Sequence, residues 1–372
     1  MAGCVSESMR ILYDHQAFSL QSTGGISRYY HELLRHLAEL DSCKPEIAIG
    51  IQRNGFDFRG LPGVKTWSFH GFRSLASGKT RYILNELLST ALFSCCGEFD
   101  VYHPTLYGHV RTARWKKMVI THHDCAYERY PALFNRVEMI KHLRARQFQM
   151  ADAIICPSES TRRDLHEFYD VPASKTFVVH HGVTRMQRDP NRRSEFVCER
   201  PFLLYVGSRA SYKNFPALLK GFAAAGLKSE FNIVVVGGGE TTDVELALIV
   251  ETGLAERVQF VPRVSDALLA EIYTQARLLV CPSLYEGFGL PPLEAMSFAC
   301  PVLAANNSSL PEICGDAAFY FQTGDLDSFV SSLQIACFDE SQRATKKENG
   351  KRLVTSYSWQ KCAASTLAIY KQ

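Results

Sequence analysis

Residues 278–298 read LLVCPSLYEGFGLPPLEAMSF, and this stretch decides the fold. The apolar run 278–282 predicts a buried strand, and the glycine-containing segment 283–290 predicts a loop. Pro291 and Pro292 predict the start of a helix, because the first helical position does not need the N–H that proline lacks. A strand, a glycine-rich loop and a helix N-terminus form the corner where open parallel sheets bind ligands, and the backbone N–H groups there favour an anion.

Two glutamates lie in this predicted corner. Glu286 is in the loop, and Glu294 is expected in the first turn of the helix. A glutamate in a first turn interacts favourably with the helix dipole, so Glu294 alone has a structural explanation as good as a functional one. Glu286 precedes Gly-Phe-Gly at 287–289 and has no capping role, so a functional role is the better interpretation of this carboxylate.

Residues 286–294, EGFGLPPLE, resemble the two-glutamate signature of retaining glycosyltransferases of family 4, with seven residues between the glutamates. This resemblance implies the GT-B fold, an α/β fold in which two Rossmann-like, doubly wound parallel-sheet domains face each other across a cleft. It also implies that the substrates are a nucleotide-sugar donor and a glycan or lipid-linked saccharide acceptor.

Composition restricts the class of protein further. A chain of 372 residues with 46% hydrophobic and 21% charged residues is long and apolar enough for two domains. The formal net charge of +3 argues against nucleic acid as the main partner, because nucleic-acid-binding domains are usually strongly basic. The 12 cysteines include no CxxC pair and no zinc-type cluster with histidine, which predicts a reducing compartment without disulfides.

Targeting signals are not evident in the sequence. No apolar run reaches the length of a membrane span, and residues 1–8 lack the apolar core of a signal peptide. We therefore expect a cytoplasmic protein.

The first half predicts a second anion-binding corner. Residues 10–14 have the pattern of a buried strand, the following loop ends in Gly24 and Gly25, and residues 26–40 have helical apolar spacing. Glycine lets the backbone approach an anion closely, although most such glycine turns have a structural role only. The placement resembles the glycine pair in the N-terminal domain of the family, which implies that Gly24 and Gly25 bind the donor.

A histidine pair follows the predicted strand 118–121. The alternative to a ligand contact is a surface turn in which histidine and aspartate hydrogen-bond to each other. The sequence Thr-His-His-Asp resembles the threonine–x–histidine–aspartate corner of the family, whose histidine contacts the donor sugar, and aligning the last two residues selects His123 rather than His122. His181, in a His-Gly ending that resembles the end of the family's first domain, is interpreted as structural or cleft-lining.

Two cations follow the predicted strand 202–206. Arg209 and Lys213 lie in the loop that leads to the next helix, where the helix dipole disfavours positive charge. A phosphate between them explains both, because arginine offers a planar fork and lysine a mobile point charge. The Arg-x-x-x-Lys spacing resembles the pyrophosphate-binding pair of the family. The family usually has glycine after the lysine; Asn214 stands there, and asparagine tolerates unusual backbone angles.

Two further corners concern nucleotides. The three glycines at 237–239 do not satisfy G-x-G-x-x-G and no helix opens directly on them, so we do not predict NAD binding. The corner between the strand 258–261 and the helix 267–276 resembles the place where family members hold the nucleobase. This resemblance assigns Arg263 and Val264 to the donor site.

The resemblance implies one role for each site residue. The implied catalytic residues are His123, Glu286, Arg209 and Lys213. The implied donor-binding residues are Gly24, Gly25, Gly207, Ser208, Arg263, Val264, Phe288, Gly289, Leu290 and Glu294. Glu294 suits the ribose hydroxyls, Glu286 and His123 suit the sugar, and the cations and N–H groups stabilise the leaving nucleoside diphosphate.

No Asp-x-Asp motif lies in a plausible corner, so we expect catalysis without a metal ion or other cofactor. A double displacement needs a carboxylate on the far face of the sugar, and none is marked. We therefore favour attack on the same face, with the departing phosphate deprotonating the acceptor hydroxyl.

The opening stretch, residues 11–37, is similar to bacterial polysaccharide and O-antigen mannosyltransferases. This implies GDP-mannose as donor and a lipid-carried glycan as acceptor, in lipopolysaccharide-type assembly. The alternatives are a UDP- or dTDP-sugar-dependent transferase and a nucleotide-sugar hydrolase, epimerase or binding protein on the same scaffold.

We expect an acceptor-side domain at 1–185, a nucleotide-sugar domain at 186–355 and a last helix at 356–372 that crosses back to the first domain. The predicted helix 137–150 and the residue before it contain Arg136, Lys141, Arg144 and Arg146. Such charges usually mark a solvated face. The alternative is peripheral association with anionic lipid on the inner face of the cell membrane.

Overall fold

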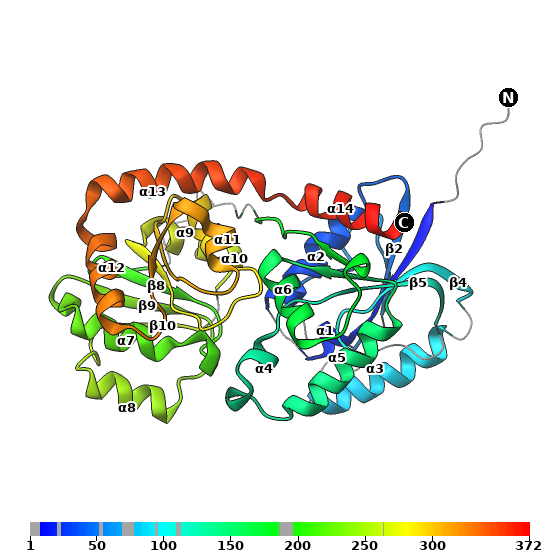
Figure 1. Cartoon of the computed structure of the whole chain (residues 1–372), viewed down its shortest axis with the longest axis horizontal. Helices are drawn as coiled ribbons and strands as arrows, with labels where there is room; N and C mark the ends of the chain where they lie inside the picture. The colour runs from blue at the N-terminus through cyan, green and yellow to red at the C-terminus, as the bar shows by residue number, and fades with distance from the viewer. Residues whose placement is uncertain are drawn as a thin grey trace. The chain divides into compact units, whose positions relative to one another are not determined.

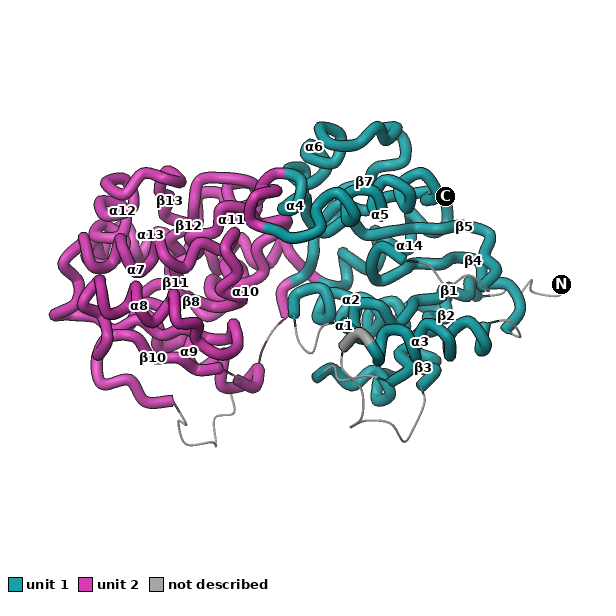
Figure 2. The backbone as a smooth tube through the Cα atoms, turned by 90° about the horizontal axis from the view of Figure 1, so that it is seen from below, with its two compact units in different colours: residues 1–128, 134–182, 359–372 teal, residues 129–133, 183–358 magenta. Residues whose placement is uncertain are grey.

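The computed structural model describes residues 8–20, 24–51, 55–68, 78–93, 96–108, 113–184, 186, 196–262 and 264–372. The chain forms two compact units (Figure 2). Unit 1 consists of Met1–Glu128, Phe134–Gly182 and Trp359–Gln372, and unit 2 consists of Arg129–Leu133 and Val183–Ser358. Among the described helices, none combines the length and apolar character needed to cross a bilayer.

Unit 1 is built on a parallel sheet with the order β3-β2-β1-β4-β5-β6-β7 within the described residues. The strands are β1 Met9–Tyr13, β2 Cys43–Gly50, β3 Lys65–Ser68, β4 Glu98–His103, β5 Arg114–Thr121, β6 Ala153–Cys156 and β7 Thr176–Val178. The helices are α1 Gln16–Leu20, α2 Gly25–Leu37, α3 Gly78–Phe93, α4 Ala126–Arg129, α5 Val137–Met150, α6 Glu159–Phe168 and α14 Trp359–Lys371. The last helix, α14, packs against α2 in this unit.

Unit 2 is built on a second parallel sheet, with the order β10-β9-β8-β11-β12-β13. The strands are β8 Phe202–Val206, β9 Asn232–Val236, β10 Val258–Val261, β11 Leu278–Cys281, β12 Val302–Ala305 and β13 Ala318–Phe321. The helices are α7 Phe215–Ala224, α8 Asp243–Glu251, α9 Asp266–Gln275, α10 Leu290–Ser297, α11 Leu310–Cys314, α12 Leu326–Phe338 and α13 Glu340–Leu353. Figure 1 shows α9 and α10 on one side of this sheet and α7 on the other.

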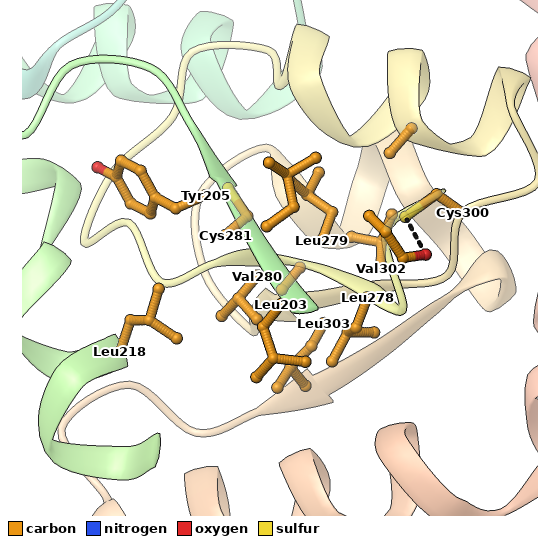
Figure 3. Packing of buried hydrophobic residues seen from close by; sticks show 14 of the residues in the cluster. Leu203, Tyr205, Leu218, Leu278, Leu279, Val280, Cys281, Cys300, Val302 and Leu303 are labelled. Atoms are coloured by element: carbon orange, nitrogen blue, oxygen red, sulfur yellow. Dashed lines mark hydrogen bonds between the residues drawn. The ribbon is translucent and has the colours of Figure 1, made fainter. Parts of the chain in front are cut away.

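The core of unit 2 explains why its strands were evident in the sequence. A parallel strand covered by helices on both faces is apolar at every position. Leu203, Leu278, Leu279 and Leu303 are fully or almost fully buried in one cluster (Figure 3). The continuous apolar runs of the sequence are therefore the central strands.

In each sheet the order in which successive strands are added reverses once. In unit 1 the chain adds β2 and β3 on one side of β1 and then returns to place β4 on the other side. In unit 2 it adds β9 and β10 on one side of β8 and then places β11 on the other. Ligands of open parallel sheets bind outside the carboxyl ends of the strands at such switch points. The loops after β1 and β4, and those after β8 and β11, are therefore the places to look for a site.

The predicted α/β class, with two doubly wound parallel sheets, is confirmed. One predicted boundary was wrong. The strand predicted at 118–121 begins at Arg114 as β5, and exposed and half-buried side chains alternate over residues 114–117.

Candidate functional site

An ion pair lies at the switch point of unit 2. Lys213 follows β8, Glu286 follows β11, and the lysine Nζ donates to Oε2 of the glutamate at 2.7 Å. The other carboxylate oxygen accepts from Ser283 Oγ at 2.7 Å. Burial alone lowers the pKa of Lys213, but the neighbouring Glu286 and Tyr212 raise it more, so this pKa lies above its ordinary value. The lysine is thus a fixed cation beside a carboxylate.

Arg209, the other predicted phosphate-binding cation, faces a different set of acceptors. Its Nε donates to Glu245 Oε1 at 2.6 Å, and its two terminal nitrogens donate to three backbone carbonyls, those of Gly237, Gly239 and Glu240. A guanidinium has five N–H groups. Acceptors within the described residues occupy four of them, which leaves one N–H of Nη1 without an acceptor in that part of the chain.

Helix α10 begins at Leu290, one residue before the expected prolines. Gly289, with a φ of 106°, precedes it in a conformation that favours glycine, and no side chain caps the helix. The earlier start moves Glu294 out of the first turn, so the prediction that placed it there was wrong. Its side chain is buried, and its Oε2 accepts from Tyr273 OH at 3.0 Å.

Serine side chains hold the glutamate loop in place. Ser309 Oγ donates to the carbonyls of Glu286 and Phe288 at 2.8 and 2.9 Å. Ser308 Oγ accepts from the N–H of Glu286 at 2.9 Å. The loop is therefore fixed by the two residues that precede α11, and the start of α10 has no side-chain cap because its N-cap is Gly289.

The other predicted donor contacts of unit 2 lie in separate loops. Gly207 follows β8 with a φ of 128° and open space where a Cβ would be, and Ser208 Oγ accepts from the N–H of Ala210 at 3.1 Å. Val264 lies between β10 and α9, whose N-cap is Ser265. Arg263 lies outside the described residues.

In unit 1, the predicted glycine pair starts α2. Gly24 is the N-cap, no side chain caps the helix, and the first turn contains no acidic residue. Both Gly24 and Gly25 are exposed. An uncapped helix start without acidic side chains is the arrangement that favours an anion.

The structure distinguishes the two adjacent histidines. Both ring nitrogens of His122 have partners, Cys125 Sγ at 3.0 Å and Tyr107 OH at 3.4 Å. His123 Nε2 is buried and has no hydrogen-bond partner within the part of the chain that the structure describes. Its ring meets Tyr29 and Tyr30 edge-on, with centroids 5.2 and 5.9 Å apart.

Burial lowers the pKa of His123 to about 4; Asp124 opposes this shift and Arg144 adds to it. At neutral pH the ring is uncharged, and we call Nε2 its open nitrogen because none of the described groups hydrogen-bonds to it.

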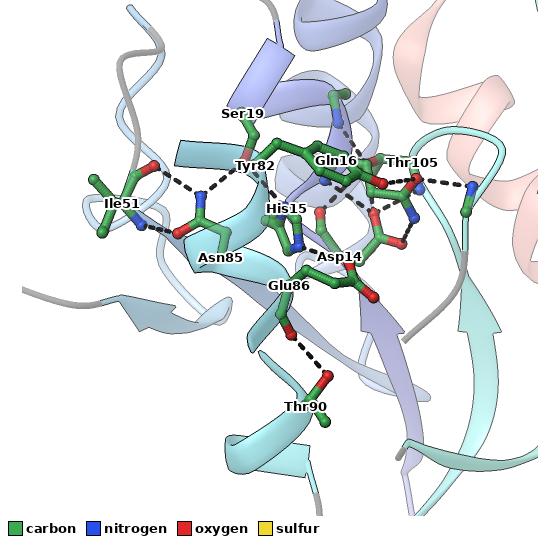
Figure 4. Close-up of polar contacts among 12 residues, drawn as sticks. Asp14, His15, Gln16, Ser19, Ile51, Tyr82, Asn85, Glu86, Thr90 and Thr105 are labelled. Carbon is green, nitrogen blue, oxygen red and sulfur yellow. Dashed lines mark hydrogen bonds and ion pairs between the residues drawn. The ribbon is translucent and has the colours of Figure 1, made fainter. Parts of the chain in front are cut away.

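A buried carboxylate that the sequence reading did not single out lies at the same edge. Asp14 follows β1 and is fully buried, and its oxygens accept from Thr105 Oγ1 and from Gln16 Nε2, each at 2.6 Å (Figure 4). They also accept from Tyr102 OH at 2.7 Å. These contacts join the segments after β1 and β4. Asp14 has its full set of donors, so we interpret it as structural.

Three other site neighbours were missed. Tyr29, Glu245 and Ser283 contact predicted site residues. The buried Tyr29 was visible as one apolar position of α2, but no local pattern links Glu245 to an arginine 36 residues away. Within the described residues, no group of three histidine, cysteine or acidic side chains could hold a metal ion.

Comparison with known proteins decides the family. Residues 23–185 match the family model described as Glycosyltransferase Family 4, and residues 187–353 match the model described as Glycosyl transferases group 1. The chain belongs to glycosyltransferase family 4. The predicted class of enzyme is confirmed.

This family 4 glycosyltransferase has relatives of modest identity. It is 27% identical over 284 residues to O-antigen chain mannosyltransferase B of Escherichia coli, covering 73% of this chain and 74% of the relative. It is 26% identical over 328 residues to the MMP alpha-(1->4)-mannosyltransferase of Mycolicibacterium hassiacum, covering 84% of this chain and 76% of the relative.

A solved structure confirms the fold of the glycosyltransferase. Sucrose-phosphate synthase from Thermosynechococcus elongatus superposes with a TM-score of 0.79 at 19% identity, over 98% of each chain.

Proposed function

We propose that the enzyme transfers mannose from GDP-mannose to a growing glycan with retention of the anomeric configuration. Two relatives named as mannosyltransferases support the sugar, and one of them is named for the O-antigen chain. A lipid-carried glycan at the cytoplasmic face of the membrane is the corresponding acceptor. UDP- and dTDP-sugars are the alternative donors.

One observation carries this proposal: the Lys213–Glu286 pair at the switch point of unit 2. A nucleoside diphosphate gains negative charge as it leaves, and a preorganised cation stabilises that charge in the transition state. Lys213 supplies the cation, together with the remaining N–H of Arg209 and the uncapped start of α10. No step then requires a metal ion.

The remaining roles follow from the environments of the side chains. Glu286, fixed by Lys213 and Ser283, orients the sugar and stabilises the positive charge that develops on it. His123 offers its open Nε2 to a sugar hydroxyl. Glu294 accepts the ribose hydroxyls while Tyr273 orients its carboxylate. The departing phosphate accepts the proton of the acceptor hydroxyl, so the new bond forms on the face that the diphosphate leaves.

Lys213→Ala and Glu286→Gln test the site. Each is expected to lower kcat at least about 100-fold, the usual effect of removing one preorganised electrostatic contact. Lys220→Ala and Glu251→Gln, at exposed positions of α7 and α8, are matched controls and are expected to retain wild-type activity. Full activity in either site variant would refute the assignment.

A nucleotide-sugar hydrolase, epimerase or binding protein is the second candidate on the same scaffold. GDP-mannose incubated with and without a lipid-linked glycan separates the two: release of GDP only with acceptor supports transfer, and release without acceptor supports hydrolysis. A thermal-shift screen with GDP-, UDP-, dTDP- and ADP-sugars identifies the donor, because a ligand that binds only the folded state raises Tm. The same screen with EDTA and with Mg²⁺ tests metal independence.

A further inference from the structure

The composition of helix α5 suggested that all its basic residues face solvent, but one of them does not. Arg144 is buried, with 3% of its side chain exposed, whereas Met139 and Leu143 are exposed. A buried guanidinium requires acceptors, because an unpaired charge inside a protein is strongly unfavourable. Its partners therefore show what this arginine does.

The guanidinium of Arg144 binds the segment that carries the open histidine. Its Nη1 donates to the carbonyl of Asp124 at 3.0 Å and to Glu128 Oε2 at 2.6 Å, and its Nη2 lies 3.7 Å from Asp124 Oδ1. Asp124 is the residue directly after His123. The single guanidinium of Arg144 thus binds both the backbone next to His123 and the carboxylate of Glu128 in α4.

Aromatic rings enclose this contact. The guanidinium carbon lies 4.6 Å from the ring centroid of Tyr107 and 5.3 Å from that of Tyr127. Tyr169 donates from its hydroxyl to the other oxygen of Glu128. A planar guanidinium can stack and donate at the same time, whereas a lysine ammonium cannot reproduce both contacts.

The next turn of α5 holds the neighbouring loop. Gln147 Nε2 donates to the carbonyls of Leu106 and Gly108 at 3.0 and 2.7 Å, in the segment after β4. Phe148 packs edge-on against His122, with centroids 5.1 Å apart. The buried face of α5 therefore fixes the segments that follow both β4 and β5, and the second of these contains His123.

We infer that Arg144 is a positioning residue, which holds the His123–Asp124 backbone so that the open imidazole nitrogen stays directed at the donor sugar. The expected effect of Arg144 on catalysis rests on the proposed function. The expected effect of Arg144 on the position and titration of the His123 imidazole does not.

The charge of Arg144 acts on the same ring. The titratable or charged groups around His123 are Tyr29 and Tyr30 from α2, His103 from β4, His122 and Asp124 beside it, His181 after β7, and Arg144 from α5. Burial is the main cause of the low pKa of His123, and Arg144 lowers it further. Loss of the guanidinium is therefore expected to move the titration of His123 upwards.

The test compares variants in which both members of an ion pair are neutralised. Arg144→Met alone leaves the fully buried carboxylate of Glu128 without its cation, so the main variant is Arg144→Met with Glu128→Gln. The matched control is Lys141→Met with Glu138→Gln, an exposed pair on the same helix. Tryptophan fluorescence and circular dichroism establish that each variant is folded.

Histidine-labelled protein gives the first readout, with the His123 resonance assigned from a His123→Gln sample. In the main variant the His123 titration midpoint should rise by about half a unit or more, and in the control it should not move. Arg144→Lys keeps the charge and loses the fork, so the midpoint should stay near that of the wild type while kcat falls.

Transfer kinetics give the second readout. We expect kcat to fall about 10- to 100-fold in the main variant, as for a misplaced catalytic contact, with the control unchanged. A folded main variant with the wild-type midpoint and wild-type kcat overturns the inference. If the wild type transfers no sugar but the His123 midpoint still shifts in the main variant, the result supports the role of Arg144 and refutes the proposed function.

Discussion

Lowering the pH from 7 to 5 is expected to weaken unit 1 by about 2 kcal/mol through His103 alone. His103 is fully buried on β4. Its Nδ1 lies 2.5 Å from Tyr370 OH and its Nε2 lies 2.9 Å from Thr121 Oγ1. Burial lowers the pKa of His103 to about 3 from an ordinary value of 6.5, and the nearby His123 adds to the shift.

The direction of the effect follows from proton binding. Below pH 6.5 the unfolded chain binds a proton at His103, but the folded chain does not do so until the pH approaches 3. Stability is therefore lost as the pH falls through this window, by about 1.4 kcal/mol per pH unit once the unfolded histidine is mostly protonated. From pH 7 to 5 this gives the figure above.

Urea unfolding followed by tryptophan fluorescence measures the loss in unit 1 specifically. The chain has 3 tryptophans, Trp67, Trp115 and Trp359, and all belong to unit 1. His103→Gln should lose about 2 kcal/mol less than the wild type between pH 7 and 5. His180→Gln, at an exposed histidine of the same unit, should behave as the wild type. An equal loss in His103→Gln and wild type would refute the reasoning.

Three further predictions concern other buried contacts. Gly238→Ala should destabilise unit 2 more than Gly239→Ala in calorimetry. Both glycines have a positive φ, but only a Cβ at position 238 would meet Arg209, at 2.6 Å. Equal losses of unfolding free energy would contradict this. Glu245→Gln should tighten GDP binding about three- to tenfold, because it removes the carboxylate that competes with the diphosphate for Arg209. Titration calorimetry at low salt measures this affinity, and weaker binding would mean that Glu245 orients the guanidinium. Tyr370→Phe should lower the free energy of unfolding by about 1–3 kcal/mol in urea, and no change would show that its buried hydroxyl is not a net contributor.

The sequence predicted the strands of unit 2 closely, since continuous apolar runs such as 202–206 are typical of strands buried on both faces. It predicted which loops carry Lys213 and Glu286 for the same reason, because loops after adjacent strands meet at one edge of a sheet. The partner of Arg209 could not be predicted, since Glu245 comes from a helix whose placement depends on tertiary packing.

The sequence also did not allow us to predict which face of α5 is buried. A basic helix normally turns its charges to solvent, but here Arg144 is buried and Leu143 is exposed. Periodicity assigns residues to faces of a helix, and it does not say which face the protein buries when polar contacts stabilise the less apolar one.

The last helix has a consequence for how the protein is made. α14 joins unit 1 through a buried contact between Tyr370 and Tyr13, two residues 357 positions apart in the chain. Every residue of unit 2 leaves the ribosome before this helix does. Unit 1 therefore completes its packing only after α14 has emerged. Until then the hydroxyl of Tyr13 and the Nδ1 of His103 lack Tyr370, the residue that both contact in the native state.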